Sequence, residues 1–202
     1  MTIFCIGRNY SEHAKELNNP IPTKPVVFCK PSGALLRENK PFFYPDFSND
    51  IHYEIELVLK ICKSGKSIPL AKCNDYYSHI TVGLDLTARD LQQECKEKGL
   101  PWEISKGFDH SAIIGNWLDK NDLNLNNIEF ELHKNKLQVQ YGKSKEMIFS
   151  FEQIIHYLSR FFRLSQGDLI YTGTPSGVGP IHKGEIFEGF IEKKQLFSCE
   201  IK

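Results

Sequence analysis

The chain has 202 residues, among them 25 basic and 25 acidic side chains, so its formal net charge is zero. This length is enough to bury a sizeable core, and a balanced charge lacks the basic field that holds a phosphate backbone, so we expect no nucleic-acid partner. The sequence also lacks an apolar run of about 18 residues, a signal-peptide pattern and a Cys-x-x-Cys pair, which predicts a cytoplasmic protein with reduced cysteines and no membrane partner.

Two short apolar runs near the start of the chain predict strands at residues 3–6 and 26–29, and the second strand is expected to be buried. Side chains able to cap a helix N-terminus precede residues 11–17, which we predict to be a short helix. His13 and Glu16 would lie on one face of it, because residues three apart are neighbours on a helix surface. Taken alone, this pair is typical of any surface helix.

Residues 51–61 alternate apolar and polar side chains with period two, which predicts a half-buried strand. The alternation places Glu54 and Glu56 on one face, with Cα atoms roughly 6.6 Å apart at a rise of about 3.3 Å per residue. Two carboxylates at this distance repel each other unless a cation lies between them, and oxygen ligands suit a hard divalent ion. The alternative is the solvated face of an amphipathic strand, which is common in antiparallel sheets.

The next predicted strand, residues 80–86, carries Asp85 at its end. Thr87 would cap the helix that follows, with Asp90 at the position of a capping box. That helix would stop near Gly99. Asp85 is well placed to bind a metal, although an acid between a strand and a helix is also an ordinary capping arrangement.

Two further polar side chains, Arg89 and Gln92, lie within this helix. After it, residues 101–110 have no regular pattern and include Lys106. A lone lysine is usually solvated, so by itself Lys106 is weak support for a site.

The second half of the chain predicts mainly strands. A glycine-rich segment at residues 172–180 contains three glycines, which allow the backbone to approach a ligand closely. A hairpin is expected with its tip at residues 134–135. The predicted strands of this half are residues 128–133, 136–141, 168–171, 185–191 and 195–201.

One helix of this half, residues 151–162, has a well-defined start, because Ser150 and Gln153 have the spacing of a capping box. Its apolar residues recur at helical spacing and predict a stripe that faces the core. The stripe consists of Phe151, Ile154, Ile155, Leu158, Phe161 and Phe162.

Predicted strands outnumber predicted helices, many connections resemble hairpins, and a strict alternation of strand and helix is missing. This pattern predicts a β-rich α+β domain with a rolled or barrel-like sheet and a few flanking helices.

Several motifs together resemble the fumarylacetoacetate hydrolase family, and more closely its small acylpyruvase/oxaloacetate decarboxylase branch. They follow one another through most of the chain, and jointly they are highly specific. The motifs are GRNY at 7–10 with His13 and Glu16, YEIEL at 53–57, GLDLTARDLQ at 83–92, KGLPW at 98–102 with Lys106, and TGTPSGVGP at 172–180.

The resemblance implies a mixed β-roll with short flanking helices, one catalytic domain over residues 1–202, a bound Mg²⁺ or Mn²⁺, and a homodimer. By this resemblance, Glu54, Glu56 and Asp85 are the metal ligands, and His13 and Glu16 match a catalytic dyad. No clear fourth carboxylate ligand is present in the sequence, so water and substrate would complete the metal shell.

Four more positions acquire roles from the resemblance. Lys106 and Gln92 match catalytic residues that contact the substrate or position water, and Lys106 would hold a developing oxyanion or a second carboxylate. Arg89 and Thr174 match substrate-binding residues, Thr174 by contacting the substrate carboxylate.

The implied activity is divalent-metal-dependent cleavage of a carbon–carbon bond in a small 2-oxo acid through a metal-bound enolate. It would hydrolyse an acylpyruvate, decarboxylate oxaloacetate, or do both. His13, oriented by Glu16, would be the general base for the attack of water in hydrolysis. An oxaloacetate keto–enol tautomerase or a sugar-acid hydratase or isomerase would use the same ligands. A non-catalytic ligand-binding domain is a third alternative, against which the intact dyad argues.

Overall fold

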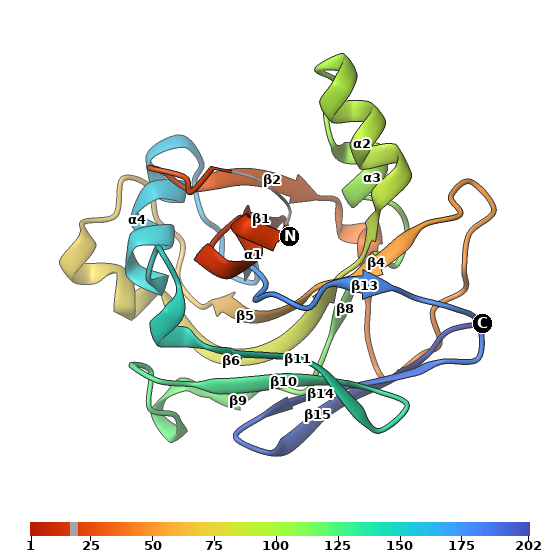
Figure 1. Cartoon of the computed structure of the whole chain (residues 1–202). Coiled ribbons are helices and arrows are strands. Elements are labelled where there is room, and N and C mark those ends of the chain that lie inside the picture. Colours follow the sequence, from red (N-terminus) through yellow and green to blue (C-terminus); the bar gives the residue numbers. More distant parts are fainter. Residues whose placement is uncertain (17–19) are drawn as a thin grey trace.

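The structure, a computed structural model, describes residues 1–16 and 20–202 apart from the side chain of Ala14. An eight-stranded sheet curves through the middle of the molecule, and a four-stranded sheet lies below it in the view of Figure 1. A small three-stranded sheet and short helices complete the arrangement. The predicted β-rich α+β class is therefore confirmed.

The large sheet is mixed. Its strands are β1 (Ile3–Gly7), β2 (Val26–Lys30), β3 (Leu35–Leu36), β5 (Ile55–Ile61), β6 (Tyr77–Asp85), β8 (Ala112–Ile114), β9 (Leu118–Asp119) and β12 (Leu169–Tyr171). They run in the order β2–β1–β12–β5–β6–β8–β3, and β9 pairs with β6. The pairs β1–β12 and β3–β8 are parallel, whereas β5 and β6 at the centre are antiparallel.

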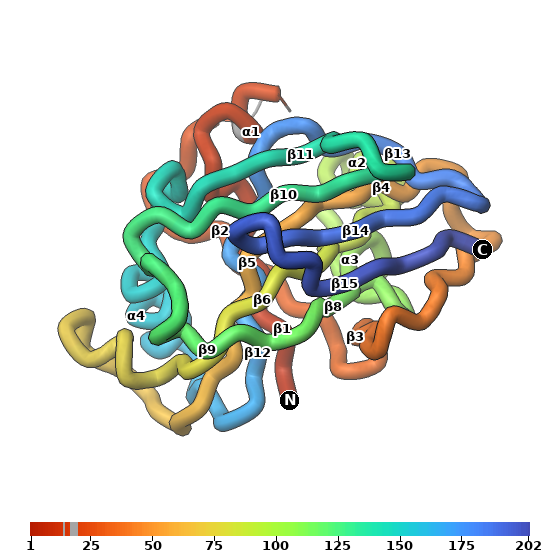
Figure 2. The backbone as a smooth tube through the Cα atoms, turned by 90° about the horizontal axis from the view of Figure 1, so that it is seen from below, coloured from red at the N-terminus to blue at the C-terminus, as the bar shows by residue number. Residues whose placement is uncertain are grey.

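The two smaller sheets are antiparallel. The four-stranded sheet contains β10 (Glu129–Lys134), β11 (Leu137–Lys143), β14 (Ile186–Ile191) and β15 (Lys194–Glu200), and the three-stranded sheet contains β4 (Ile51–Tyr53), β7 (Thr87–Ala88) and β13 (Gly179–Pro180). Figure 2 shows β11, β10, β14 and β15 side by side, crossing in front of β5 and β6.

The helices lie at the edges of this framework. They are α1 (Ser11–Glu16), α2 (Arg89–Lys98), α3 (Glu103–Lys106) and α4 (Phe151–Phe161), with 3₁₀ turns at Ser32–Ala34, Leu70–Tyr76, Lys120–Asp122 and Ser144–Glu146. Helices α2 and α3 stand together at the upper edge of the molecule in Figure 1. Within the described part of the chain, no helix has both the length and the apolar character needed to cross a membrane.

The two faces of the large sheet have different surroundings. Leu57 and its alternate neighbours on β5 belong to the main core, which includes Phe130 and Phe187 of the four-stranded sheet. Val58 belongs to a smaller cluster on the other face. Because successive side chains of a strand point to opposite faces, Glu56 lies on the same face as Val58.

The segment 51–61 differs from its prediction in two respects. It forms two strands, because the chain leaves the large sheet at Glu54 and β4 pairs with β13 and β7 instead. Both faces of β5 are also covered, with Glu56 only 2% exposed and Val58 fully buried. The interpretation as a solvated strand face is therefore wrong.

Helix α2 begins differently from its prediction. Thr87 lies in β7, and Ala88 is the N-cap residue without a side-chain capping bond. Asp90 accepts hydrogen bonds from Ser48 and Asn49 instead. The predicted end is confirmed, because Gly99 has the left-handed φ of 64° that favours glycine.

Four other predictions need small corrections. The segment 101–110, predicted to be irregular, contains the short helix α3. The hairpin tip consists of residues 135 and 136, both with positive φ, one position later than predicted. Strand β2 is only half-buried except for Lys30. The capping box of Ser150 and Gln153 is confirmed, but Phe161 and Phe162 at the other end of the helix are 55% and 40% exposed. Residue 17, the predicted end of the first helix, lies outside the described residues.

Candidate metal centre and active site

Three buried carboxylates meet at the end of the β5–β6 pair. Glu54, Glu56 and Asp85 each offer an oxygen, and these oxygens lie within 4.8 Å of one another. The backbone N–H of Asp85 donates to the carbonyl of Glu54 over 2.9 Å, which holds the two residues side by side. The break between β4 and β5 thus places Glu54 beside the end of β6.

Two of these carboxylates share one ammonium group. Lys106, on α3, is buried, and its Nζ lies 2.7 Å from Oε2 of Glu54 and 2.8 Å from Oδ2 of Asp85. Burial lowers the pKa of Lys106, but the charges of Asp85 and Glu54 outweigh burial and raise this pKa above its ordinary value. The expectation that a lone lysine in this segment is solvated is wrong.

Arg89 approaches Glu54 from the first turn of α2. Its Nη2 donates to Oε1 of Glu54 over 2.6 Å, and its Nη1 donates to Oε1 of Gln92 over 2.7 Å. Burial alone would raise the pKa of Glu54, yet the charges of Lys106 and Arg89 hold this pKa well below its usual value. Glu54 is therefore a carboxylate that stays ionised although it is buried.

Lys30, which the sequence analysis did not identify, lies behind the cluster. Its Nζ lies 2.8 Å from Oδ1 of Asp85 and donates to the carbonyl of Leu86 and to Ser111. Burial lowers the pKa of Lys30 more than the charge of Asp85 raises it. The sequence did contain a sign that Lys30 could be buried. Lys30 directly follows the apolar run 26–29, and strand β2 extends through it.

Glu56 differs from the other two acids because, among the described residues, it contacts backbone rather than a cation. Its Oε2 accepts a hydrogen bond of 2.6 Å from the N–H of Gly173. Burial, followed by the charge of Asp85, raises the pKa of Glu56 well above its ordinary value. A buried carboxylate beside two others is the environment that a bound cation would stabilise.

The residues present fit a divalent ion. The three side chains offer only oxygen ligands, which Mg²⁺ and Mn²⁺ prefer. One of them, Glu56, contacts no lysine or arginine of the described chain, so a bound ion would supply the positive charge that favours its ionised form. Metal ligation by these three residues thus stays a prediction that the geometry allows.

The predicted dyad lies on α1 beside the cluster. Nδ1 of His13 lies 3.0 Å from Oε2 of Glu16, and Oε1 of Glu16 accepts a hydrogen bond of 3.0 Å from the N–H of Gly177. His13 is only 4% exposed, although it belongs to a short helix at the surface. The glycine-rich segment therefore holds the dyad over the pocket.

Thr174 is held in place by a residue that the sequence analysis missed. Its Oγ1 accepts a hydrogen bond of 2.9 Å from Nε2 of Gln140, and Oε1 of Gln140 accepts one of 2.9 Å from the N–H of Ile55. Nothing in the sequence pattern of the hairpin distinguishes Gln140 from its polar neighbours, because its role depends on a contact between distant segments.

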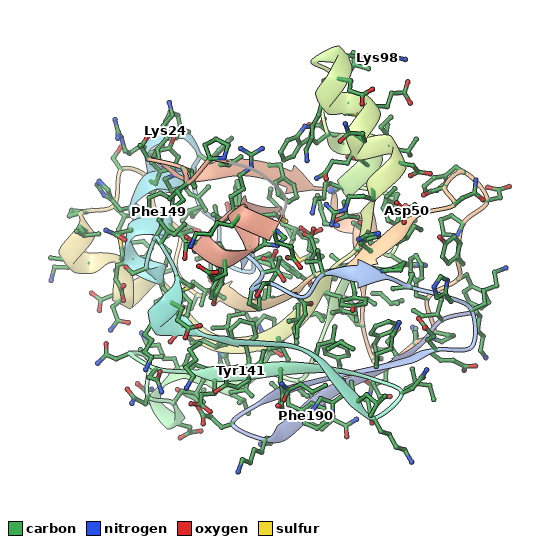
Figure 3. The ribbon with its side chains drawn as sticks, viewed as in Figure 1. Lys24, Asp50, Lys98, Tyr141, Phe149 and Phe190 are labelled. Atoms are coloured by element: carbon green, nitrogen blue, oxygen red, sulfur yellow. The ribbon has the colours of Figure 1, made fainter. Side chains whose placement is uncertain are left out.

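These groups line one pocket, whose cavity volume is about 30 Å³. Eight of the nine predicted site residues line it, and the ninth, Glu16, binds His13. The backbone N–H of Arg89, the first residue of α2, donates a hydrogen bond to the carbonyl oxygen of Asp50. The labels of Asp50 and Lys98 in Figure 3 therefore mark the two ends of α2. The lining residues not predicted as site residues are Ile6, Gly7, Arg8, Phe28, Lys96 and Trp102.

Curated relatives resemble the chain over most of its length. An oxaloacetate decarboxylase of Dictyostelium discoideum, named as mitochondrial, is 43% identical over 188 residues, which are 92% of this chain and 86% of that protein. An oxaloacetate tautomerase of Mus musculus, also named as mitochondrial, is 41% identical over 191 residues, which are 94% of this chain and 86% of that protein.

A solved structure confirms the fold. The fumarylpyruvate hydrolase of Pseudomonas aeruginosa, in complex with Mn²⁺ and pyruvate, is 38% identical and superimposes with a TM-score of 0.93, covering all of this chain and 89% of that one. The predicted mixed β-roll of this family is therefore confirmed.

The family model described as fumarylacetoacetate (FAA) hydrolase C-terminal matches residues 2–202. Together with the relatives and the solved structure, this match confirms the resemblance that the motifs indicate and the prediction that the chain is an enzyme. The chain belongs to the fumarylacetoacetate hydrolase family.

Proposed function

We propose that this enzyme breaks a carbon–carbon bond in a small 2-oxo acid with the help of a divalent metal, by hydrolysing an acylpyruvate, decarboxylating oxaloacetate, or both. The observation that carries the proposal is the cluster of Glu54, Glu56 and Asp85, which lines the same pocket as His13. The names of the relatives support it, since they include an oxaloacetate decarboxylase and a fumarylpyruvate hydrolase with bound Mn²⁺ and pyruvate.

The metal would be Mg²⁺ or Mn²⁺, held by these three carboxylates. When bound, it supplies a Lewis acid that stabilises the negative charge left on the 2-oxo oxygen as the bond breaks. Lys106 and Arg89 lower the pKa of buried Glu54, so Glu54 would be ionised, as a metal ligand must be. Thr174, fixed by Gln140, would contact the substrate carboxylate.

His13 would be the general base. A carboxylate only accepts hydrogen bonds, so Glu16 fixes the proton of His13 on Nδ1 and leaves Nε2 free to take a proton from water. Gly177 anchors Glu16 in turn, which limits the freedom of the ring. Water attack is required for hydrolysis but not for loss of CO₂, so His13 would serve mainly the hydrolytic reaction. Gln92, on the pocket wall, would position that water.

Tautomerisation of oxaloacetate is the second candidate, because the mouse relative is named an oxaloacetate tautomerase. His13 would then move a proton between C3 and the 2-oxo oxygen, and the carbon skeleton would stay intact. The purified chain with Mg²⁺ or Mn²⁺ should be assayed with acetylpyruvate and oxaloacetate, with separate detection of acetate, CO₂ and enol. Enol interconversion without release of acetate or CO₂ would establish the tautomerase alternative.

We also propose that residues 1–202 act as one catalytic domain in a cytoplasmic homodimer. The six cysteines are free, which suits a reducing compartment. The exposed aromatic rings of Phe161 and Phe162 support self-association. Light scattering coupled to size-exclusion chromatography tests the dimer, because a mass equal to one chain at all concentrations would contradict it.

A further inference from the structure

Asn9 has no role in the reaction outlined above, yet its side chain is fully buried. Its Nδ2 donates hydrogen bonds of 2.8 Å to the carbonyl of Thr172 and of 3.0 Å to the carbonyl of Phe149, and its Oδ1 accepts one of 2.8 Å from the N–H of Phe149. Because a carbonyl only accepts and a backbone N–H only donates, these partners fix which end of the side-chain amide faces Thr172.

The peptide group between Thr172 and Gly173 connects Asn9 to the carboxylate cluster. Its carbonyl accepts the hydrogen bond from Asn9, and its N–H donates to Oε2 of Glu56 over 2.6 Å. Among residues 1–16 and 20–202, this is the only hydrogen bond that the Glu56 carboxylate receives. Since successive hydrogen bonds polarise one another, the bond from Asn9 strengthens the donor that faces Glu56.

Gly173 by itself does not fix the direction of this peptide. It has a φ of 104°, and glycine adopts positive and negative φ about equally readily, so its backbone tolerates a peptide that is turned over. The carbonyl would then face the carboxylate of Glu56, and the buried Nδ2 of Asn9 would lose an acceptor, which is costly. A Cβ at residue 173 would lie 2.5 Å from Cβ of Asn9, so the two residues also pack closely. Asn9 is therefore the group that selects the observed direction.

The same glycine-rich segment reaches the dyad. Figure 1 shows it, in blue, passing between α1 and β5, where Gly173 donates to Glu56 and Gly177 donates to Glu16. Asn9 lies two residues before α1 and holds the first turn of this segment, while Glu16 holds a later turn.

We propose that Asn9 is a positioning residue for the metal centre. It holds the peptide between Thr172 and Gly173 with the N–H towards Glu56, and so keeps this carboxylate in the orientation that binds the ion. The inference rests on the proposed function in one respect, because Glu56 must be a metal ligand. The alternative is that Asn9 only anchors the segment before α4, through Phe149, which is labelled in Figure 3.

Calorimetric titration with Mn²⁺ tests the effect on the ion. Asn9→Ala should weaken binding by about 10- to 100-fold, the usual effect of removing a group that supports a metal ligand. Ser150→Ala is the matched control, because Ser150 follows Phe149 and caps α4, and its side chain bonds only Glu152 and Gln153 in the described chain. It should lower stability and leave the affinity unchanged. An equal loss of affinity in the two variants would overturn the inference.

The amide proton resonance of Gly173 in the metal-free protein distinguishes this role from a general loss of stability. A short hydrogen bond to a carboxylate shifts an amide proton downfield, so the resonance should move upfield in Asn9→Ala and stay in place in Ser150→Ala. Glu56→Gln, which removes the carboxylate charge, gives the reference position. An unchanged resonance in Asn9→Ala would contradict the role of Asn9.

The two measurements separate this inference from the proposed function. A wild-type protein that binds no Mn²⁺ would contradict the metal centre, and an upfield shift confined to Asn9→Ala would still support the orienting role of Asn9. Equal Mn²⁺ affinity of the wild type and Asn9→Ala would leave the metal centre intact and overturn the inference.

If Asn9→Ala does not fold, the wild-type protein decides. Scalar couplings across the two hydrogen bonds should then be measurable by NMR, one from Nδ2 of Asn9 to the carbonyl carbon of Thr172 and one from the nitrogen of Gly173 to the carboxylate carbon of Glu56. The absence of either coupling would overturn the inference.

Discussion

Glu16 accepts a hydrogen bond of 3.0 Å from the backbone N–H of Gly177, and this contact joins helix α1 to the glycine-rich segment. The other oxygen of the same carboxylate lies 3.0 Å from Nδ1 of His13. One side chain therefore both positions the helix and orients the imidazole. These two functions can be separated by substitution.

Glu16→Gln keeps an oxygen that can accept from Gly177 but removes the charge beside His13, whereas Glu16→Ala removes both contacts. We expect hydrolysis to fall in both variants, since both lose the stabilisation of a protonated His13. Hydrogen exchange at the amides of residues 11–16 should accelerate only in Glu16→Ala. Equal acceleration in the two variants would show that the charge, not the contact with Gly177, holds the helix.

His13→Ala should separate the two cleavage reactions. Hydrolysis of acetylpyruvate should fall by about 10²- to 10⁴-fold, the usual contribution of a general base, because water attack needs proton removal. Decarboxylation of oxaloacetate should change far less, since no water attacks the substrate. The measurement is kcat for each substrate with the same metal-loaded preparation, and equal losses in both reactions would contradict the assignment.

The sequence alone predicts part of the carboxylate cluster, because period two places Glu54 and Glu56 on one face of a strand. Asp85 is harder to place from pattern alone, since an acid after a strand is also an ordinary cap. Its position beside Glu54 depends on the register in which Ile55 pairs with Leu84. The resemblance to the family motifs, and not the periodicity of the sequence, predicted that Asp85 lies beside Glu54 and Glu56.

Other features could not be read from local pattern. Lys30 and Lys106 are buried because distant carboxylates compensate their charges, and sequence spacing contains no measure of such contacts.

The apolar stripe of α4 predicts the burial of Ile155 correctly but also includes Phe161, which is 55% exposed. Helical spacing indicates which residues share a face of the helix, but it does not indicate how far along the helix other segments pack against that face.

Lys30→Met should destabilise the metal-free protein by about 3–5 kcal/mol, because it leaves Asp85 with one buried partner fewer. Saturating Mn²⁺ should then raise the melting temperature of the variant more than that of the wild type, since the ion compensates the same carboxylate. Lys60→Met, on the same sheet and stacked on Trp117, is the control. An equal metal-induced shift in Lys30→Met and wild type would refute a direct link between Lys30 and the metal site.

Substitutions along α4 test the extent of the core. Ile155 is fully buried, and Ile155→Ala should cost about 2–5 kcal/mol of unfolding free energy. Phe161→Ala should cost less than about 0.5 kcal/mol in the monomer, because the ring is exposed. Urea denaturation at two protein concentrations measures both values. A cost for Phe161→Ala that grows with protein concentration would indicate that a second chain covers the ring.

If Glu54, Glu56 and Asp85 together hold one divalent ion, calorimetric titration with Mn²⁺ should detect it. The wild-type chain should bind one ion, and Glu54→Gln, Glu56→Gln and Asp85→Asn should each weaken binding by about a hundredfold or more, since loss of a supporting contact alone costs about 10- to 100-fold. Glu103→Gln, an exposed carboxylate on α3, should bind like the wild type. Unchanged affinity and stoichiometry in these three variants would show that the carboxylate cluster does not hold the ion.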